Sequence, residues 1–494
     1  MAISVFGILL LSIFYYSTWT VNYKYSIAID SGSTHSRVIL FRWKADKLNN
    51  TGLIEEINSC KINQGIASYV NNDDNKVVDD IFKCIQNITV DLKIKNESLY
   101  VYLAATAGMR LLYLTDQNLA TKILDQIRNE FQKSGMIVKR ISIITGQEEG
   151  MFAWIAANYL SGTLFSNKSI GILDMGGASA QIARAIRSKD KQNDDDDENY
   201  KQIRLFGNEY LIHTFSNLCF GSEQALYRYI RLLISRHTDK NNTINVACFP
   251  RGYQTSSTKY PINNNVCTEM KSESANTNNK HNEYDLIGTG QIEQCQKDID
   301  WLLNRQKCEE NFKICFKNIT IESNDDYNNQ QMNLFYAIST YYYETKVLGF
   351  EKLENISRQQ YLNEYKRLCT KTFDELNNEL RIDIKYTSNK CFKLPFIIST
   401  LTNIYKFNDK TWPLLKFAHD VNKTYLGWIT GMMINESNEI ASEQPIIYFI
   451  SNVIYWAMII TFIMIFIISV IIVYNLKIHR KIGKQKRVVH NTFV

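Results

Sequence analysis

Two short segments of the chain place an aspartate directly before a turn of small residues. Asp30 ends an apolar run and precedes Ser31-Gly32-Ser33-Thr34-His35, and Asp174 ends a similar run before Met175-Gly176-Gly177-Ala178-Ser179. In such a turn the backbone N–H groups are exposed and no large side chain blocks a phosphate. One such turn is usually an ordinary β-hairpin. Two turns that share a preceding aspartate predict a pair of phosphate-binding loops.

The same two aspartates predict a divalent cation. Mg²⁺ keeps most of its water and is usually held by one or two carboxylates together with substrate phosphates. Asp30 and Asp174 on facing lobes would hold a hydrated ion in this way, although either one alone would be interpreted as a hydrogen-bonding turn residue. A site that binds several phosphate oxygens, a cation and one water is what phosphoryl transfer to water requires.

A pair of glutamates is the candidate source of a general base. Glu148 and Glu149 begin a predicted helix directly after a strand. Neighbours on a helix point about 100° apart, so at most one of them can face a cleft. That carboxylate could accept a proton from an attacking water. Spacing alone favours the simpler interpretation, in which both acidic residues stabilise the helix N-terminus.

The segments around these residues predict a mixed α/β fold. Each Asp-ended loop lies between two β-prone runs, and this duplicated hairpin indicates two similar lobes that face each other. The predicted strands are 26–30, 37–42, 99–104, 139–144, 170–174 and 181–185, and the predicted helices are 117–133 and 151–160. Three polar segments, 188–199, 263–283 and 322–333, are predicted to be solvated insertions.

Both ends of the chain are apolar. Residues 454–473 carry no charge and match the roughly 20 residues that a helix needs to cross a bilayer. Six basic residues follow between 477 and 487, which places the C-terminal tail in the cytoplasm. Residues 2–20 lack the basic start of a standard signal peptide, so a retained anchor is favoured over a cleaved signal. The tail accounts for the formal charge of +6, which leaves little support for a nucleic-acid surface.

The region between the apolar ends contains all ten cysteines, an even number that predicts disulfides in an oxidising compartment. Neither a CxxC spacing nor a His pair accompanies them, so zinc is poorly supported. Nine N-x-S/T sequons permit glycosylation, although an Asn-rich chain also produces them by chance. The middle region is therefore expected in a lumen or outside the cell.

Five segments resemble the signature regions of the apyrase and guanosine-diphosphatase family, the ecto-nucleoside triphosphate diphosphohydrolases. They are IDSGSTHS (29–36), ATAGMRLL (105–112), TGQEEG (145–150), LDMGGAS (173–179) and GWITGM (427–432). The resemblance implies the two-lobed actin/hexokinase-like (RNase H-like) α/β fold, with an active-site cleft between the lobes and transmembrane helices at the termini. Paired anchors and ten cysteines are similar to the cell-surface branch, whereas a short connection between 154 and 174 leaves a Golgi or lysosomal membrane as the alternative.

Position by position, the resemblance implies a role for each matching residue. Glu149 matches the catalytic base, with Glu148 as the alternative, and Asp30 and Asp174 match residues that hold Ca²⁺ or Mg²⁺ through water. Tyr342 matches a tyrosine that stacks on the base. The phosphate- and nucleotide-binding positions are Ser33, His35, Thr106, Gly176, Gly177, Ala178, Ser179 and Gln181, of which Thr106 and Gln181 help to position the metal and the water.

The resemblance also implies a disulfide order, and we expect six segments along the chain. The implied pairs are Cys60–Cys84, Cys219–Cys267, Cys248–Cys295, Cys308–Cys315 and Cys369–Cys391. The expected segments are an N-terminal anchor or signal (1–21), lobe I (22–145), lobe II (146–418), a return to lobe I (419–444), a transmembrane helix (446–474) and a basic tail (475–494).

The predicted function is hydrolysis of the terminal phosphates of nucleoside tri- or diphosphates, to the monophosphate and phosphate. Ca²⁺ or Mg²⁺ would assist a water activated by Glu149, outside the cell or in a lumen, with the plasma membrane favoured. The expected partners are the nucleotide, a membrane and further copies of the chain in a homo-oligomer. A silent receptor or adhesion ectodomain and a small-molecule kinase on the same fold are the alternatives.

Overall fold

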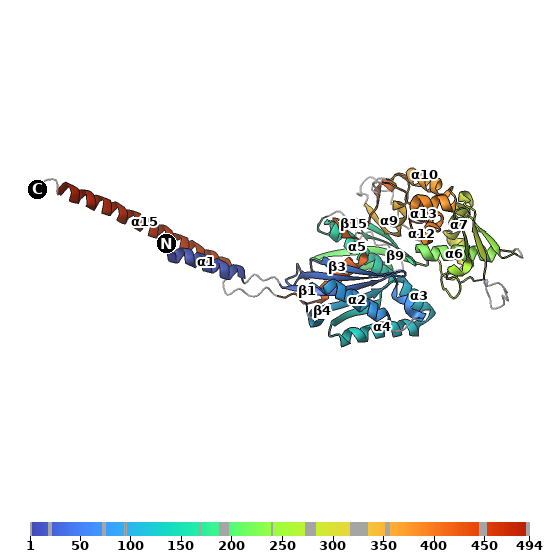
Figure 1. Cartoon of the computed structure of the whole chain (residues 1–494), viewed down its shortest axis with the longest axis horizontal. Helices are drawn as coiled ribbons and strands as arrows, with labels where there is room; N and C mark the ends of the chain where they lie inside the picture. Colours follow the sequence, from blue (N-terminus) through green and yellow to red (C-terminus); the bar gives the residue numbers. More distant parts are fainter. Residues whose placement is uncertain are drawn as a thin grey trace. The chain divides into compact units, whose positions relative to one another are not determined.

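The structure is a computed structural model of the chain. It describes residues 2–17, 22–71, 76–92, 94, 96–166, 169–186, 197–238, 241–271, 283–316, 334–350, 356–443 and 452–490 (Figure 1). The predicted insertion 322–333, and most of 188–199 and 263–283, lie outside these residues. The chain divides into a smaller unit, Met1–Tyr23 with Lys44–Lys47 and Ser442–Val494, and a larger unit made of the remainder.

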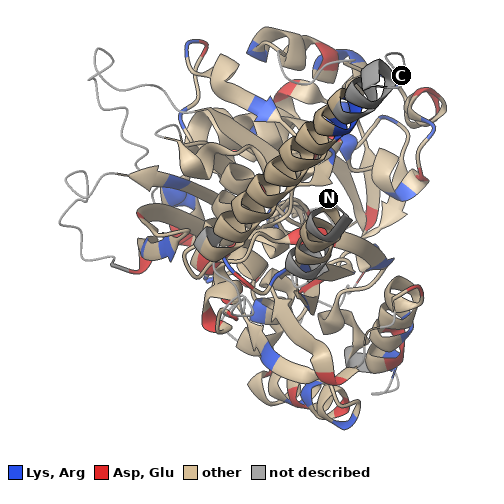
Figure 2. Ribbon diagram, turned by 90° about the vertical axis from the view of Figure 1, so that its left-hand side faces the viewer, with Lys and Arg blue, Asp and Glu red and all other residues tan. Residues whose placement is uncertain are grey.

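The smaller unit contains α1 (Ala2–Ser17) and α15 (Asn452–His490), which pack against each other, with the hydroxyls of Ser12 and Tyr455 3.3 Å apart. Among the described helices, one is long and apolar enough to cross a membrane, the Ile454–Ile482 part of α15. Figure 2 shows Lys and Arg gathered towards the C-terminal end of α15. This helix overlaps the predicted span at 446–474. The span and the second anchor at α1, a helix of 16 residues, stay predictions.

The larger unit is built on two sheets with the same internal plan. In each sheet the strand that carries the aspartate, β1 (Tyr23–Ser31) or β6 (Gly171–Met175), neighbours its hairpin partner on one side. On its other side lies a parallel strand, β4 (Leu99–Ala105) or β13 (Phe335–Ser339). This repeat confirms the predicted duplicated hairpin. The strand orders are β3 (Glu55–Ile62), β2 (Ser36–Lys44), β1 (Tyr23–Ser31), β4 (Leu99–Ala105), β5 (Ile137–Ile143), and β14 (Leu415–Phe417), β13 (Phe335–Ser339), β6 (Gly171–Met175), β7 (Ser179–Ile186), β9 (Asn208–Leu218), β8 (Tyr200–Leu205).

Alternation along the strands separates three apolar cores. On β1, Ile27 and Ile29 join a core with α2 (Lys76–Thr89) and α4 (Gln117–Lys133), whereas Ala28 faces a central core that contains residues of both sheets. The remaining elements are α6 (Ser222–Arg236), α7 (Ile292–Leu302), α8 (Arg305–Asn311), α9 (Thr340–Lys346), α10 (Arg358–Cys369), α11 (Phe373–Leu380), α12 (Ile384–Thr387), α13 (Lys390–Ser399), β10 (Thr243–Val246), β11 (Gln254–Ser256), β12 (Asp285–Gly288), β15 (Asp420–Val421) and β16 (Thr424–Tyr425), and several of these helices enclose the third core.

Two helices fill the central core, α5 (Gly146–Leu160) and α14 (Trp428–Glu436). They touch through their backbones at Gly431, where a Cβ would lie 1.8 Å from the carbonyl oxygen of Phe152. The predicted stretch 151–160 began too late, whereas the prediction that Glu148 and Glu149 begin this helix is confirmed. Thr145 and Glu148 form a capping box that begins α5 at Gly146. Glu148 and Glu149 therefore lie in the first turn of α5.

The five disulfides join the cysteines in the pairs that the resemblance implied, with Cα–Cα distances from 4.8 to 5.8 Å. Four of them lie between Cys219 and Cys391, where they connect the loops and helices of the third core. Cys60–Cys84 ties β3 to α2. These bonds confirm the predicted disulfide order.

Replacing Lys393 by Met is expected to lower the free energy of unfolding by about 3 kcal/mol, the lower end of the loss for breaking a buried pair, because Glu223 loses its ion pair whereas Glu344 keeps Lys390 at 2.6 Å. Lys393 is buried and pairs with Glu223 of α6 and, at 3.9 Å, with Glu344 of α9. Denaturant unfolding of Lys371→Met is the control. Its exposed pair with Glu379 is expected to contribute at most about 1 kcal/mol. Equal losses in both variants would show that the buried network does not carry this stability.

Candidate active site

The two small-residue turns lie against each other. The backbone N–H of Gly32 donates to the carbonyl of His35 at 3.0 Å, and that of Gly176 donates to the carbonyl of Ser179 at 3.0 Å, so both turns close in the same way. A Cβ on Gly177 would lie 2.7 Å from Oγ of Ser33. A side chain at this position would press on that hydroxyl, so glycine suits the close approach of the two turns. The fold thus brings the two predicted phosphate loops together.

The first loop is held from behind by two segments of the first lobe. The carbonyl of Ser31 accepts a bond from the N–H of Thr106 at 3.0 Å, and its hydroxyl accepts one from the N–H of Ile66 at 3.2 Å. Thr106 is buried and precedes α3 (Ala107–Thr115). These bonds place Thr106 directly beside the first loop.

Glu149 lies at the centre of a buried polar cluster. Its Oε2 accepts bonds from Nη2 of Arg110 at 2.8 Å and from Nε2 of Gln181 at 3.1 Å. The same two donors bond the hydroxyl of Ser179, at 2.9 and 2.7 Å. Among the described residues, none donates a hydrogen bond to Oε1 of Glu149. One carboxylate oxygen is therefore held by the protein and the other is left for a proton.

The carboxylate of Glu148 lies outside this cluster and caps the N-terminus of α5. Its carboxylate accepts bonds from Arg140 at 2.8 Å and from the backbone N–H of Thr145 at 2.8 Å. Burial alone would raise the pKa of Glu148, but the bonds from Arg140 and Thr145 bring it below the ordinary value. Glu148 is thus the residue that caps the helix, as the simpler interpretation of the sequence has it, while Glu149 faces inward.

Three carboxylates repel one another in this region. Burial raises the pKa of Asp174 to about 7, and the charge of Glu149 contributes to the rise. Burial and the charges of Glu149 and Asp174 also raise the pKa of Asp30 well above its ordinary value. Burial raises the pKa of Glu149, and the ion pair with Arg110 offsets part of that rise. Such a cluster favours a bound cation.

The residues fit a hydrated cation rather than a directly coordinated one. Within the described part of the chain, no three His, Cys, Asp or Glu side chains lie close enough to hold an ion between them. Asp174 stands opposite Gln181 in the β6–β7 register, and Oε1 of Gln181 is a buried acceptor that has no partner among the described residues. Water around a cation would supply the missing donor.

His35 and Tyr342 lie at the edges of this arrangement. Burial lowers the pKa of His35, and Lys61 and Arg37 lower it further, so the imidazole is neutral at pH 7. Tyr342 packs on the ring of His419, with centroids 5.4 Å apart. Tyr342 lies in α9, which begins directly after Ser339, and Ser339 bonds Asp174. Base stacking by Tyr342 stays a prediction.

Three residues that belong to the site were not predicted from the sequence. Arg110 bonds both Glu149 and Ser179, Ser216 bonds Nε2 of Gln181 at 3.0 Å, and Ser339 bonds Asp174. Arg110 had a usable signal, since it follows Thr106 by one helical turn inside the second signature segment. The two serines lie on strands whose pairing was not predicted.

Replacing Arg110 by Gln is expected to move the acidic limb of the pH profile of kcat/KM to higher pH. The guanidinium lowers the pKa of Glu149, so its removal raises that pKa and leaves less carboxylate at a given pH. Phosphate release measured across pH checks this. Arg140→Gln, which frees Glu148 instead, is the matched control and is expected to leave the limb in place.

Known proteins resemble the chain over most of its length. The GDA1/CD39 (nucleoside phosphatase) family matches residues 17–448. Ectonucleoside triphosphate diphosphohydrolase 3 of Mus musculus is 30% identical over 442 residues, which are 86% of this chain and 80% of that one. Ectonucleoside triphosphate diphosphohydrolase 1 of Bos taurus is 28% identical over 442 residues, 86% of this chain and 83% of that one.

A solved structure confirms the fold. The crystal structure of nucleoside triphosphate hydrolases from Neospora caninum superposes with a TM-score of 0.62 and covers 88% of this chain and 97% of its own, at 14% identity. At that identity the likeness concerns architecture alone, and it agrees with the predicted two-lobed α/β fold. The family match over residues 17–448 and the two relatives show that this chain is an enzyme of the GDA1/CD39 (nucleoside phosphatase) family.

Proposed function

We propose that the protein hydrolyses the terminal phosphates of nucleoside tri- and diphosphates, with a divalent cation and a water activated by Glu149. The observation that carries the proposal is the carboxylate of Glu149. It is buried, and its Oε2 accepts hydrogen bonds from Arg110 and Gln181, which also bond Ser179 of the second loop. Its Oε1 accepts no hydrogen bond from any described residue.

The chain's own residues would divide the work as follows. The backbone N–H groups of the turns around Ser33 and Gly177 bind the terminal phosphate, and the hydroxyl of Ser179 is held towards it by Arg110. Glu149 takes a proton from the water as the water attacks phosphorus. Burial helps here, because it raises the pKa of Glu149 towards the working pH of a general base.

Asp30 and Asp174 would hold the cation through its water, with Gln181 accepting a further hydrogen bond from that water. When bound, Ca²⁺ or Mg²⁺ neutralises charge on the phosphate oxygens. The three repelling carboxylates and the unpartnered Gln181 oxygen support such an ion, and neither feature distinguishes calcium from magnesium.

We place the larger unit on the extracellular or lumenal side of a membrane, with α15 as an anchor. Five disulfides favour an oxidising compartment. The basic end of α15 favours a cytoplasmic C-terminus. The plasma membrane is our preferred location, and a second anchor at α1 and a homo-oligomer belong to the same proposal.

Hydrolysis in ¹⁸O-labelled water tests the reaction. With ATP and Mg²⁺ and no acceptor, we expect one labelled oxygen in each released phosphate and none in the nucleoside monophosphate. Label in the monophosphate would mean attack at the inner phosphorus and would contradict the proposal. Phosphate transfer that requires an added acceptor would favour a kinase instead.

A further inference from the structure

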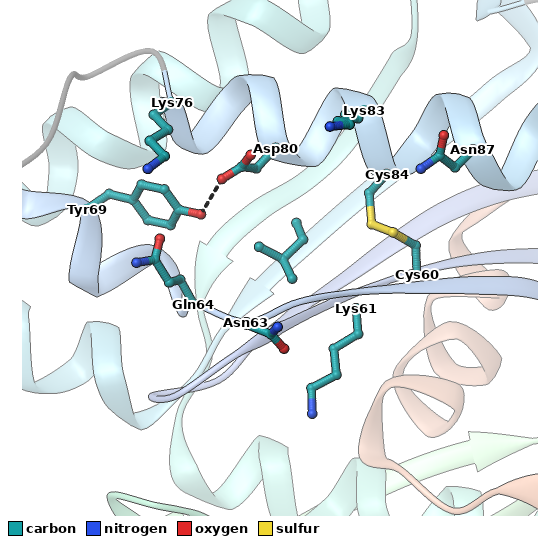
Figure 3. Close-up of a pocket in the computed structure, with 11 residues that line it drawn as sticks. Cys60, Lys61, Asn63, Gln64, Tyr69, Lys76, Asp80, Lys83, Cys84 and Asn87 are labelled. Carbon is teal, nitrogen blue, oxygen red and sulfur yellow. Dashed lines mark hydrogen bonds between the residues drawn. A yellow bond between two sulfur atoms is a disulfide. The ribbon is translucent and has the colours of Figure 1, made fainter.

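A polar pocket of about 540 Å³ lies between β3 and α2 (Figure 3). Its lining includes none of the site carboxylates Asp30, Glu149 and Asp174. At one end Tyr69 donates a hydrogen bond to Asp80 at 2.8 Å, and near the other end lies the Cys60–Cys84 disulfide. The other polar side chains of the wall make no hydrogen bond with any described residue. These are Lys61, Asn63, Gln64, Lys76, Lys83 and Asn87.

One of these side chains belongs to a glycosylation sequon. Asn87, Ile88 and Thr89 end α2, and Asn87 is exposed. Lys83 precedes Asn87 by one helical turn, so both side chains lie on the same face of α2. Figure 3 shows the amide of Asn87 beside the disulfide, at the opposite end of the pocket from Tyr69. A group attached to this amide can enter the pocket.

The other described sequons differ from Asn87. The side-chain amides of Asn49, Asn96 and Asn422 donate to backbone carbonyls of the fold, at 3.0, 3.1 and 2.8 Å. Asn435 is partly buried on α14, and Asn241 is exposed but lines neither of the described pockets. Among the described sequons, Asn87 therefore combines an exposed amide that bonds no described residue with an adjoining polar pocket.

We propose that Asn87 carries an N-linked oligosaccharide whose first sugars lie in this pocket. Sugar hydroxyls and acetamide groups both donate and accept hydrogen bonds, which suits the amides of Asn63 and Gln64 and the donor of Lys83. In the transfer, Nδ2 of Asn87 loses a proton and bonds C1 of the first sugar, and the lipid pyrophosphate that carried the sugar leaves with the electron pair.

The pocket wall continues into the support of the first phosphate loop. The carbonyl of Gln64 accepts a bond from the hydroxyl of Ser36 at 3.0 Å, and Ile66 bonds the hydroxyl of Ser31. A sugar held against Gln64 therefore stabilises the wall on which that loop rests. The expected effect is on stability, not on the chemical step.

Glycopeptide mass spectrometry of the full chain from N-glycosylating cells tests the attachment. We expect sugar on Asn87 in the natural chain and in Thr89→Ser, which keeps the sequon, and none in Asn87→Gln or Thr89→Ala. Asn87→Gln is expected to lower Tm by about 2–4 °C. Asn241→Gln, which removes an exposed sequon elsewhere, is expected to leave Tm unchanged. All four variants should keep the wild-type kcat, so this result is independent of the proposed hydrolysis.

The rate at which an enzyme releases the sugar from the folded protein tests whether the sugar lies in the pocket. An endoglycosidase is expected to cleave the Asn87 sugar at least about tenfold more slowly than sugars at other sequons, a free-energy difference of roughly 1.4 kcal/mol. Replacing Gln64 and Lys83 by Ala should remove the difference. If the natural chain lost its Asn87 sugar as fast as the sugars at other sequons, the proposal that the sugar lies in the pocket would be wrong. An unmodified Asn87, with inorganic phosphate raising Tm through Lys76 and Lys83, would overturn the proposal in favour of an anion site.

Discussion

Replacing Glu149 by Gln is expected to lower kcat by about 10²–10⁴-fold, the usual loss when a positioned general base is removed. Gln has nearly the same shape and still accepts bonds from Arg110 and Gln181 through its amide oxygen, so the fold should be retained. The KM for the nucleotide is expected to change little, because Glu149 acts on the water and not on the bound phosphates. Phosphate release under saturating ATP measures the loss.

Glu148→Gln is the matched control for this substitution. Gln at the third position of α5 still completes the capping box with Thr145. The variant loses the ion pair with Arg140, which affects stability more than turnover. We expect it to keep most of the wild-type rate. If Glu148→Gln lost its activity and Glu149→Gln kept the wild-type kcat, Glu148 would be the general base and our assignment would be wrong.

Removal of divalent cations is expected to abolish hydrolysis, and either Ca²⁺ or Mg²⁺ should restore it. Without the ion, the charges of Asp30, Asp174 and Glu149 repel one another and the incoming phosphates. The measurement is phosphate release after EDTA treatment, followed by titration with each cation. Full activity in EDTA would remove the cation from the account.

Two further variants locate the ion. Asp174→Asn and Asp30→Asn each remove one negative charge, so each should raise the cation concentration needed for half-maximal activity. Binding of Mn²⁺ followed by its paramagnetic effect on water relaxation gives a second readout that does not depend on turnover. Asp116→Asn is the control. This aspartate caps α4 and lies at the surface, outside the site.

The sequence alone predicted the parts of the fold that have a local cause. An apolar β-prone run that ends in Asp before a small-residue turn indicates a strand and loop directly, and both copies form the central strands of their sheets. Helix α4 occupies the predicted residues 117–133, because its apolar spacing is regular and Asp116 caps its first turn. The disulfide order followed from the family resemblance, since spacing alone could not have chosen it.

The parts that were missed depend on tertiary contacts. Arg110 reaches Glu149 and Ser179 only because α3, α5 and β7 converge, and no local pattern reports such a meeting. The glutamate pair was predicted at a helix start, but the predicted stretch 151–160 began too late because the capping box of Thr145 and Glu148 was not recognised. The difference between Glu148 and Glu149 likewise required the structure, since both lie in the same helical turn.

The most direct test of the central claim compares the natural chain with Glu149→Gln on a panel of ATP, ADP, UDP and GDP. The full-length protein in detergent, with Ca²⁺ or Mg²⁺ and no acceptor, is followed by phosphate release and by chromatography of the products. We expect the natural chain to yield nucleoside monophosphate and phosphate from at least one of these nucleotides, and Glu149→Gln to yield about 10²-fold less or lower still. No phosphate from any nucleotide, or equal yields from both proteins, would contradict the account.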